Sequence, residues 1–128
     1  DGHHTLVIRS TVAPGTTRAR IAPLLEQAAG RKIGDRLSLV FNPEFLREGA
    51  AIGDFKRPDR IVVGAEDPRA EEVLREIYRP LFLNQAPILV TGRRTAELTK
   101  YAANAFLATK ITFINEIADL CEQVGADV

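Results

Sequence analysis

Apolar runs of strand length alternate with amphipathic segments over about the first ninety residues. Each run is rich in aliphatic or β-branched residues, which is typical of buried strands. The four runs are Leu6–Ile8, Leu37–Phe41, Arg60–Gly64 and Ile88–Val90. Because helix-forming segments separate them, the pattern predicts an α/β fold with a mostly parallel sheet.

Two helices are expected between these strands. The first should begin at Thr16 or Thr17, either of which can cap it, and should run to about Ala29. Pro23 lies inside this segment and should bend the helix, unless the helix begins later. The second is expected over residues 67–78, with an acid at its cap and a proline in its first turn.

A third, much longer helix is expected over Arg94–Val124, a stretch that contains neither proline nor glycine. A helix of this length would extend about 46 Å, which is more than a small domain needs. It therefore suits a helix that links two lobes or packs on a partner. Apolar or small residues recur along it at steps of three and four: Tyr101, Ala105, Ala108, Ile111, Ile114, Ile117 and Cys121.

Composition excludes several classes of function. The 17 basic and 17 acidic residues among 128 are interspersed, so no basic stripe favours nucleic acid and no polybasic patch favours a membrane surface. No apolar run approaches the roughly 20 residues that span a bilayer. A single cysteine fits a reducing compartment, and we expect a cytoplasmic protein. His3 and His4 have no visible ligand partners, so no metal site is expected.

Candidate chemistry begins directly after the second predicted strand, in the segment Asn42–Gly49. Pro43 should end the strand because it lacks a backbone donor. Glu44 and Glu48 then lie on a constrained loop at a strand end, where open α/β sheets build their sites. Taken alone, two such carboxylates are more often ordinary solvated surface acids.

A second candidate pair lies on the long helix. Lys100 and Asn104 are four residues apart and therefore share a helix face. Most lysines are exposed, but the neighbours of Lys100 are apolar or small, notably over Tyr101–Ala103. We therefore expect a partly desolvated lysine that is held for a purpose.

Three segments, Arg9–Thr17, Asn42–Gly49 and Ala96–Phe106, together resemble the nucleotide-sugar dehydrogenases of the UDP-glucose/GDP-mannose dehydrogenase family. They occur in the order and at roughly the spacing that the family uses, and the resemblance covers almost the whole chain. It implies the later part of a Rossmann-like NAD-binding domain over residues 1–92. Residues 93–128 would begin the central helical region through which the family forms homodimers.

The resemblance also assigns roles at the cofactor and at the sugar. Thr11 would position a water near the nicotinamide, with Ser10 and Val12 contacting NAD at the strand end. Lys100 would bind substrate and stabilise the oxyanion at C6 of the sugar. Asn104 would help to hold the sugar and an ordered water.

The loop residues receive roles in the same way. Glu44 would work in acid–base catalysis with the lysine, and Glu48 would act as a base or as a contact to the cofactor. Both glutamates belong to the substrate-binding loop, together with the backbone of Phe45, Leu46 and Arg47. Which glutamate activates the hydrolytic water stays open at this stage.

The implied reaction is the oxidation of UDP-glucose to UDP-glucuronate by two NAD molecules, through a thioester on a cysteine. Cys121 lacks the family's Cys-x-Pro-Lys-Asp surroundings and is expected to be a small buried apolar residue. The glycine fingerprint G-x-G-x-x-G is also absent. We therefore expect an interior piece of the enzyme, inactive alone. Asp59 and Arg60 are expected to form a structural ion pair or turn, and Pro14–Gly15 a turn without a phosphate.

Other functions remain possible from the sequence. Within the family, the substrate could instead be GDP-mannose or UDP-N-acetylmannosamine, and the cofactor NADP. A noncatalytic dimerisation or binding module could reuse the scaffold. That module would have no need of Thr11, Glu44, Glu48, Lys100 and Asn104, all of which are present. A simpler hydroxyacid dehydrogenase would have no reason to carry the two loop glutamates together.

Overall fold

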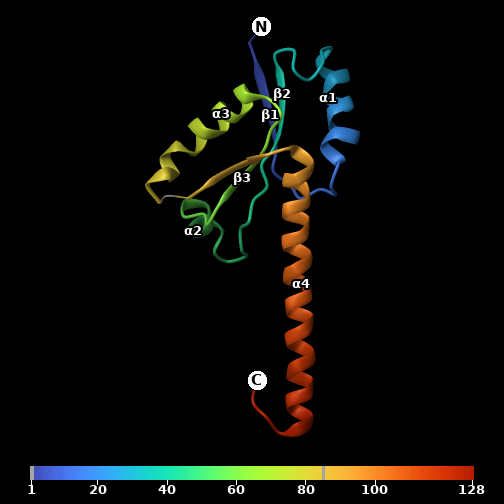
Figure 1. Ribbon diagram of the computed structural model, residues 1–128, viewed down its shortest axis with the longest axis vertical. Coiled ribbons are helices and arrows are strands. Elements are labelled where there is room, and N and C mark those ends of the chain that lie inside the picture. The colour runs from blue at the N-terminus through green and yellow to red at the C-terminus, as the bar shows by residue number, and fades with distance from the viewer. Residues whose placement is uncertain (1, 85) are drawn as a thin grey trace.

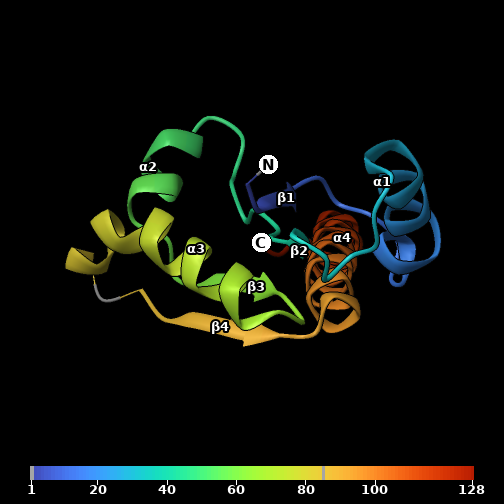
Figure 2. The same cartoon turned by 90° about the horizontal axis from the view of Figure 1, so that it is seen from above.

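The computed structural model describes residues 2–84 and 86–128, and over these ranges the strands form one four-stranded sheet (Figures 1 and 2). The strands are β1 (His4–Ile8), β2 (Leu37–Phe41), β3 (Ile61–Gly64) and β4 (Ile88–Thr91), in the order β1-β2-β3-β4. β1 pairs with β2 and β3 with β4 in parallel, whereas β2 and β3 are antiparallel. The four predicted strands and the mostly parallel sheet are confirmed.

The helical elements follow the prediction with two additions. In chain order they are η1 (Thr17–Ile21), α1 (Ala22–Ala29), α2 (Ala51–Lys56), α3 (Pro68–Tyr78), η2 (Arg79–Asn84) and α4 (Arg93–Val124). The short helices α2 and η2 were not expected, because neither segment is long enough to develop a clear helical period.

The first predicted helix is divided by the effect of its proline. η1 is a π-helical turn, in which the N–H of Ala22 donates to the carbonyl of Thr17. Pro23 then falls in the first turn of α1, where its missing N–H removes no hydrogen bond. The alternative to a bend is therefore found, because the α-helix itself begins later than expected, at Ala22, after a π-helical turn. The expected capping is wrong, because the Thr16 hydroxyl donates instead to the carbonyl of Ala13 and that of Thr17 is unpartnered among the described residues.

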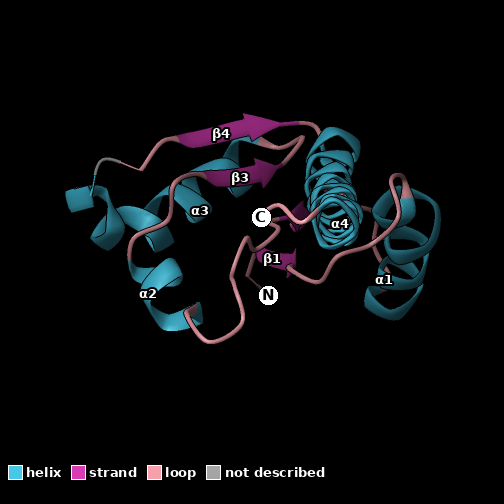
Figure 3. Ribbon diagram, turned by 90° about the horizontal axis from the view of Figure 1, so that it is seen from below, coloured by secondary structure: helices cyan, strands magenta, loops and turns pink. Residues whose placement is uncertain are grey.

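The two faces of the sheet bury separate clusters, because side chains alternate along each strand. One face packs against α3, and its buried cluster includes Val40, Ile61, Val63, Ala70, Leu74 and Tyr78. The other face packs against the beginning of α4 through Phe41, Val62 and Ala96. Figure 3 shows α1 and α4 at one end of the sheet, and α2 and α3 at the other.

Gly64, the last residue of β3, allows α4 to lie against the sheet. A Cβ atom at this position would be 2.8 Å from both the Cβ of Ala96 and the Cα of Arg93. It would also be 3.2 Å from the carbonyl oxygen of Phe41. No side chain fits at these distances without movement of backbone, so the close approach requires glycine.

Only the beginning of α4 is packed. Arg93, Ala96, Glu97 and Lys100 are buried, whereas most side chains from residue 101 onward are exposed. Figure 1 shows the helix extending well beyond the sheet. The predicted long helix is thus confirmed, and no described helix is long and apolar enough to cross a membrane.

α3 begins with a cap that also joins it to the sheet. Asp67 accepts a hydrogen bond from the N–H of Arg69 at 2.9 Å and another from the hydroxyl of Ser38. Ser38 is also hydrogen-bonded to Nε2 of His3, at 2.8 Å. The Ser38 bond is the main reason why the pKa of Asp67 lies below its ordinary value.

We predict that Gly64→Ala will destabilise the chain by about 1–3 kcal/mol, because the new methyl group would overpack the contact with α4. Urea unfolding followed by circular dichroism measures this loss. Gly53→Ala, inside α2, is the matched control, because its new methyl group would meet no neighbouring atom within 4 Å. It should be neutral or slightly stabilising, and equal losses in both variants would contradict the prediction.

A second prediction concerns the pH dependence of the α3 cap. Because the pKa of Asp67 is lower in the folded chain, its contribution to stability is present above its ordinary pKa and is lost as the pH falls through the lowered value. A carbon-13 NMR titration of the carboxyl group should give this lowered pKa. Ser38→Ala should raise it toward the ordinary value, and an unchanged pKa in that variant would refute the assigned cause.

Candidate functional site

Lys100 and Glu44 meet beside the loop that follows β2. Lys100 is 6% exposed, and its Nζ atom lies 3.6 Å from Oε1 of Glu44. The same Nζ atom lies 5.2 Å from the centre of the Phe45 ring. The expected desolvation of this lysine is therefore found, and a carboxylate and an aromatic face balance its charge.

Glu44 is held by its own loop as well as by the lysine. Its Oε2 atom accepts a hydrogen bond from the N–H of Leu46 at 2.7 Å. One carboxylate oxygen thus fixes the loop while the other faces Lys100. The constrained loop that Pro43 and the two glutamates predicted is present, and it orients Glu44 in particular.

A second anchor joins the loop to α2. Arg47 donates to Asp54 through its backbone N–H at 2.9 Å, its Nε at 3.1 Å and its Nη2 at 2.7 Å. The hydrogen bonds from Arg47 lower the pKa of Asp54 to about 2. The Arg47 side chain is therefore engaged within the chain.

A cavity of about 440 Å³ opens along this loop, bounded also by α2 and the start of β3. Inside it, Nη1 of Arg9 donates to the hydroxyl of Tyr78 at 3.1 Å. That hydroxyl donates in turn to Oδ1 of Asn42 at 2.5 Å, and Nδ2 of Asn42 donates to the carbonyl of Val62. This chain of bonds orients Arg9 on one side of the cavity.

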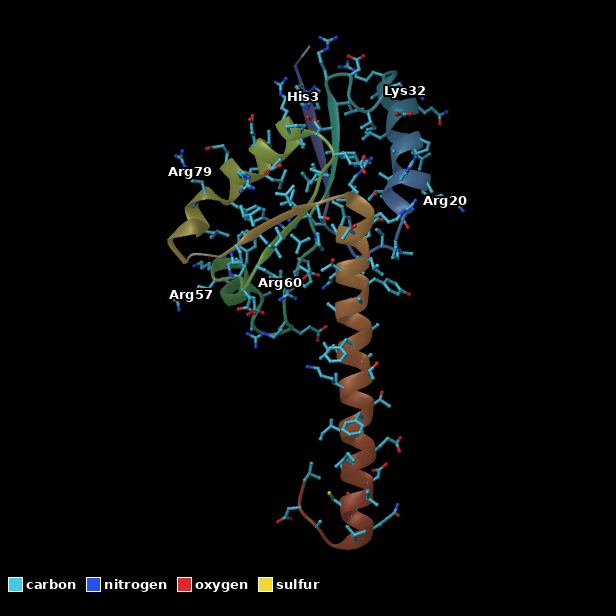
Figure 4. All side chains as sticks on the ribbon, in the orientation of Figure 1. His3, Arg20, Lys32, Arg57, Arg60 and Arg79 are labelled. Atoms are coloured by element: carbon cyan, nitrogen blue, oxygen red, sulfur yellow. The ribbon has the colours of Figure 1, made fainter. Side chains whose placement is uncertain are left out.

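Arg60 borders the same cavity from the segment that joins α2 to β3 (Figure 4). Its guanidinium carbon lies 4.4 Å from the centre of the Phe45 ring. The expected ion pair between Asp59 and Arg60 is not formed within the described residues, although Asp59 does lie in a bend. The aromatic face of Phe45 takes the place of the carboxylate, because a guanidinium group stacks well on a ring.

The remaining predicted site residues lie outside the contact of Lys100 with Glu44 and Phe45. Glu48 and Asn104 are exposed, and their side chains form no hydrogen bond with the described residues. Ser10 and Thr11 are exposed beyond the carboxyl end of β1, and Val12 is half-buried against the cluster that contains Phe41. The structure therefore assembles Lys100, Glu44 and Phe45, and leaves the others free for a ligand.

The segment after β1 fits the expected cofactor. β1 is an edge strand of the described sheet, and ligands of open α/β sheets bind beyond the carboxyl ends of the strands. Ser10 and Thr11 expose their hydroxyl groups at that end, while Val12 fixes the segment to the core. These are the residues for which the resemblance implies a contact with NAD.

The sequence did not single out Glu97. It is fully buried on α4, and its carboxylate accepts hydrogen bonds from the N–H groups of Gly15 and Thr17. These two groups begin the helical segment of η1, so Glu97 supplies the cap that was expected from Thr16 or Thr17. The only sequence signal was a glutamate three residues before Lys100 on one helix face.

Two other expectations concerned Cys121 and the histidines. Cys121 is only half-buried, and its Sγ atom lies 3.6 Å from the carbonyl oxygen of Asp127, so the expected burial is wrong. The reason is that, among the described residues, little packs against this end of α4. Within residues 2–84 and 86–128, no group of three or more potential ligands is placed to hold a metal ion.

Comparison with protein families finds two adjoining matches. Residues 1–82 match the model of the UDP-glucose/GDP-mannose dehydrogenase family, NAD binding domain, and residues 94–128 match that family's central domain. NAD is accordingly the cofactor of the family.

Individual relatives agree with the family models. The chain is 60% identical to UDP-glucose 6-dehydrogenase of Rhizobium meliloti, over 99% of this chain and 29% of the relative. It is 48% identical to UDP-glucose 6-dehydrogenase AglM of Haloferax volcanii, over 99% of this chain and 30% of the relative. The chain thus spans about three tenths of the length of these relatives.

Two solved structures have the same fold. A ternary complex of GDP-mannose dehydrogenase from Pseudomonas aeruginosa superposes with a TM-score of 0.90 at 44% identity, over 97% of this chain and 28% of that one. UDP-glucose dehydrogenase from Pyrobaculum islandicum gives a TM-score of 0.85 at 49% identity, over 97% of this chain and 27% of that one. From its sequence, its fold and these matches, the chain belongs to the UDP-glucose/GDP-mannose dehydrogenase family.

Proposed function

We propose that this chain is part of an NAD-dependent nucleotide-sugar dehydrogenase that oxidises UDP-glucose to UDP-glucuronate. The observation that carries the proposal is the buried Lys100, held against Glu44 beside the loop that follows β2. Residues 1–92 would be the later part of the NAD-binding domain, and residues 93–128 the start of the central helical region. A buried ammonium is costly unless it is paired, and paired buried charges of this kind cluster at functional sites.

The reaction converts a primary alcohol and one water into a carboxylate, with loss of two hydrides and three protons. NAD, when bound, accepts a hydride in each of the two oxidation steps. Negative charge develops on the substrate oxygen as the proton leaves and again when water adds to the carbonyl carbon. Lys100 would donate to that oxygen in a site with little water, where a fixed cation lowers the barrier most effectively.

Glu44 is the better candidate for moving protons. It already contacts Lys100 and is oriented by Leu46, whereas Glu48 is exposed and forms no hydrogen bond with the described residues. Glu44 would accept a proton from the substrate hydroxyl or from the hydrolytic water. Glu48, Asn104 and Thr11 would contact the substrate and cofactor from the open side of the site.

The covalent thioester step is assigned to a cysteine outside these residues. Cys121 lies in the last turn of α4, about 30 Å along the helix from the buried Lys100. Figure 1 shows that this end of α4 extends well beyond the sheet. One helix cannot bring both to a single substrate carbon. The relatives are more than three times as long as this chain, which leaves room for the nucleophile elsewhere.

We favour UDP-glucose as the substrate because the chain is more similar in sequence to a UDP-glucose 6-dehydrogenase than to dehydrogenases of the other sugars. The relatives named as UDP-glucose 6-dehydrogenases include one that is 60% identical, whereas the GDP-mannose dehydrogenase structure is 44% identical. The UDP-N-acetylmannosamine dehydrogenase Cap5O of Staphylococcus aureus is 27% identical. GDP-mannose is therefore the first alternative.

We also propose that α4 joins two copies of the protein. Large apolar side chains are exposed along it: Tyr101, Phe106, Leu107, Ile111, Phe113, Ile114, Leu120 and Val124. They occupy more of the helix circumference than one small domain can cover. A second copy related by a two-fold axis would cover the same residues on both helices.

The function is tested with Lys100→Ala in the enzyme that contains this chain. We expect kcat for NADH formation from UDP-glucose to fall about 100- to 1000-fold with a much smaller change in KM, because the cation acts chiefly when the oxyanion develops. Lys110→Ala, an exposed lysine on the same helix, is the control and should keep activity. An effect confined to KM would reduce Lys100 to a ground-state binding residue.

Association through α4 is tested on the 128-residue chain by sedimentation equilibrium. Phe113→Glu should shift the chain from dimer to monomer, because it places a charge in the proposed apolar contact. Leu24→Glu makes the same change at an exposed apolar position on α1 and should leave the dimer intact. A wild-type chain that stays monomeric at high concentration would be evidence against the dimer.

A further inference from the structure

Glu97 holds a distant segment of the chain against α4. Its Oε1 atom accepts a hydrogen bond from the N–H of Thr17 at 2.8 Å, and its Oε2 atom accepts one from the N–H of Gly15. The carboxylate has no exposed surface, and Thr17 is equally buried. Both oxygens are thus committed to backbone groups that lie about eighty residues earlier in the sequence.

The segment that Glu97 holds is also joined by hydrogen bonds of its own. The carbonyl of Ala13 accepts bonds from both the N–H of Thr16, at 3.1 Å, and its hydroxyl, at 2.6 Å. Gly15 adopts a left-handed backbone conformation with φ of 92°, and its carbonyl accepts from the N–H of Ala19. A displacement of Gly15 caused by a change at Glu97 would therefore also move the residues immediately before Gly15.

Those residues include Thr11, which lies four positions before Gly15. Val12 between them packs on the cluster that contains Ala96, the neighbour of Glu97 on α4. Lys100 lies three residues after Glu97, on the same side of the same helix. Because an α-helix is stiff over one turn, the spacing from Glu97 to Lys100 is fixed.

We propose that Glu97 is a positioning residue, which sets the separation between Thr11 on the cofactor side and Lys100 on the substrate side. The inference rests on the proposed function for the roles of those two residues. A carboxylate suits the task because it accepts two backbone bonds at a helix beginning and is favoured there by the helix dipole. Proximity of reacting groups is sensitive to displacements of about 1 Å.

A residue that only stabilised the fold would have a different signature. Its loss would lower the unfolding midpoint, with little change in the activity of the molecules that remain folded. A positioning residue should instead change kcat at temperatures where the variant is fully folded, with a much smaller change in KM. Its effect should also depend on the presence of Thr11.

The first measurement is made on the 128-residue chain and needs no activity. In the wild type, the amide protons of Gly15 and Thr17 should exchange at least about tenfold more slowly than those of exposed loop residues. Glu97→Gln retains the size of the side chain but leaves only one acceptor oxygen, so at least one of the two amides should lose its protection. Glu122→Gln, at an exposed position on the same helix, should change neither. Rapid exchange of both amides in the wild type would overturn the proposal.

The second measurement uses the enzyme that contains this chain. We expect Glu97→Gln to lower kcat at least about tenfold, with KM for UDP-glucose changed less than about threefold. Combined with Thr11→Ala, its effect should be less than multiplicative, because both changes disturb the same geometry. If Glu97→Gln does not fold, Glu97→Asp retains the charge but is one methylene shorter, and it should give the same pattern.

The outcomes separate this inference from the proposed function. A wild-type enzyme without dehydrogenase activity would refute the proposed function, whatever the exchange data show. An active wild type whose Glu97 variants fold and turn over at the wild-type rate would refute the positioning role alone. Loss of stability with an unchanged kcat would likewise assign Glu97 to the fold.

Discussion

The site depends on the close contact between the first turns of α4 and the sheet. At Gly64 the absence of a side chain lets Ala96 and the backbone of Arg93 approach within the distance at which a Cβ atom would collide. The contacts that α4 makes in the site follow from this approach, because it fixes where Glu97 and Lys100 lie on one helix. A small shift of α4 would move both residues together relative to the segments that they contact.

Two segments converge on α4 from different parts of the chain. The turn that begins η1 is joined to it by hydrogen bonds to Glu97, and the loop after β2 is joined to it by the pair of Lys100 and Glu44. The loop is held a second time by Arg47 on Asp54 of α2. The polar groups that make these contacts lie on different elements, which makes their geometry specific as well as stable.

The exposed part of α4, after Lys100, differs from the packed beginning of the helix. Beyond Lys100 the helix has little packing against the described residues, although its sequence carries a wide apolar surface. Its helical form over such a length is consistent with the absence of proline and glycine between Arg93 and Val124. One end of the helix is thus fixed by the sheet, while the other offers the surface through which we propose that two copies associate.

The sequence by itself determined the strands and the long helix, because apolar periodicity and local turn residues act over a few positions. The partnership of Glu44 with Lys100 was expected from the family resemblance, and the structure brings the two side chains together. The tertiary structure alone decided that Arg60 stacks on Phe45 and that Glu97 caps a helix about eighty residues earlier in the chain. These choices depend on the distance between elements far apart in the sequence. Local pattern carries no information about that distance until packing against the sheet fixes it.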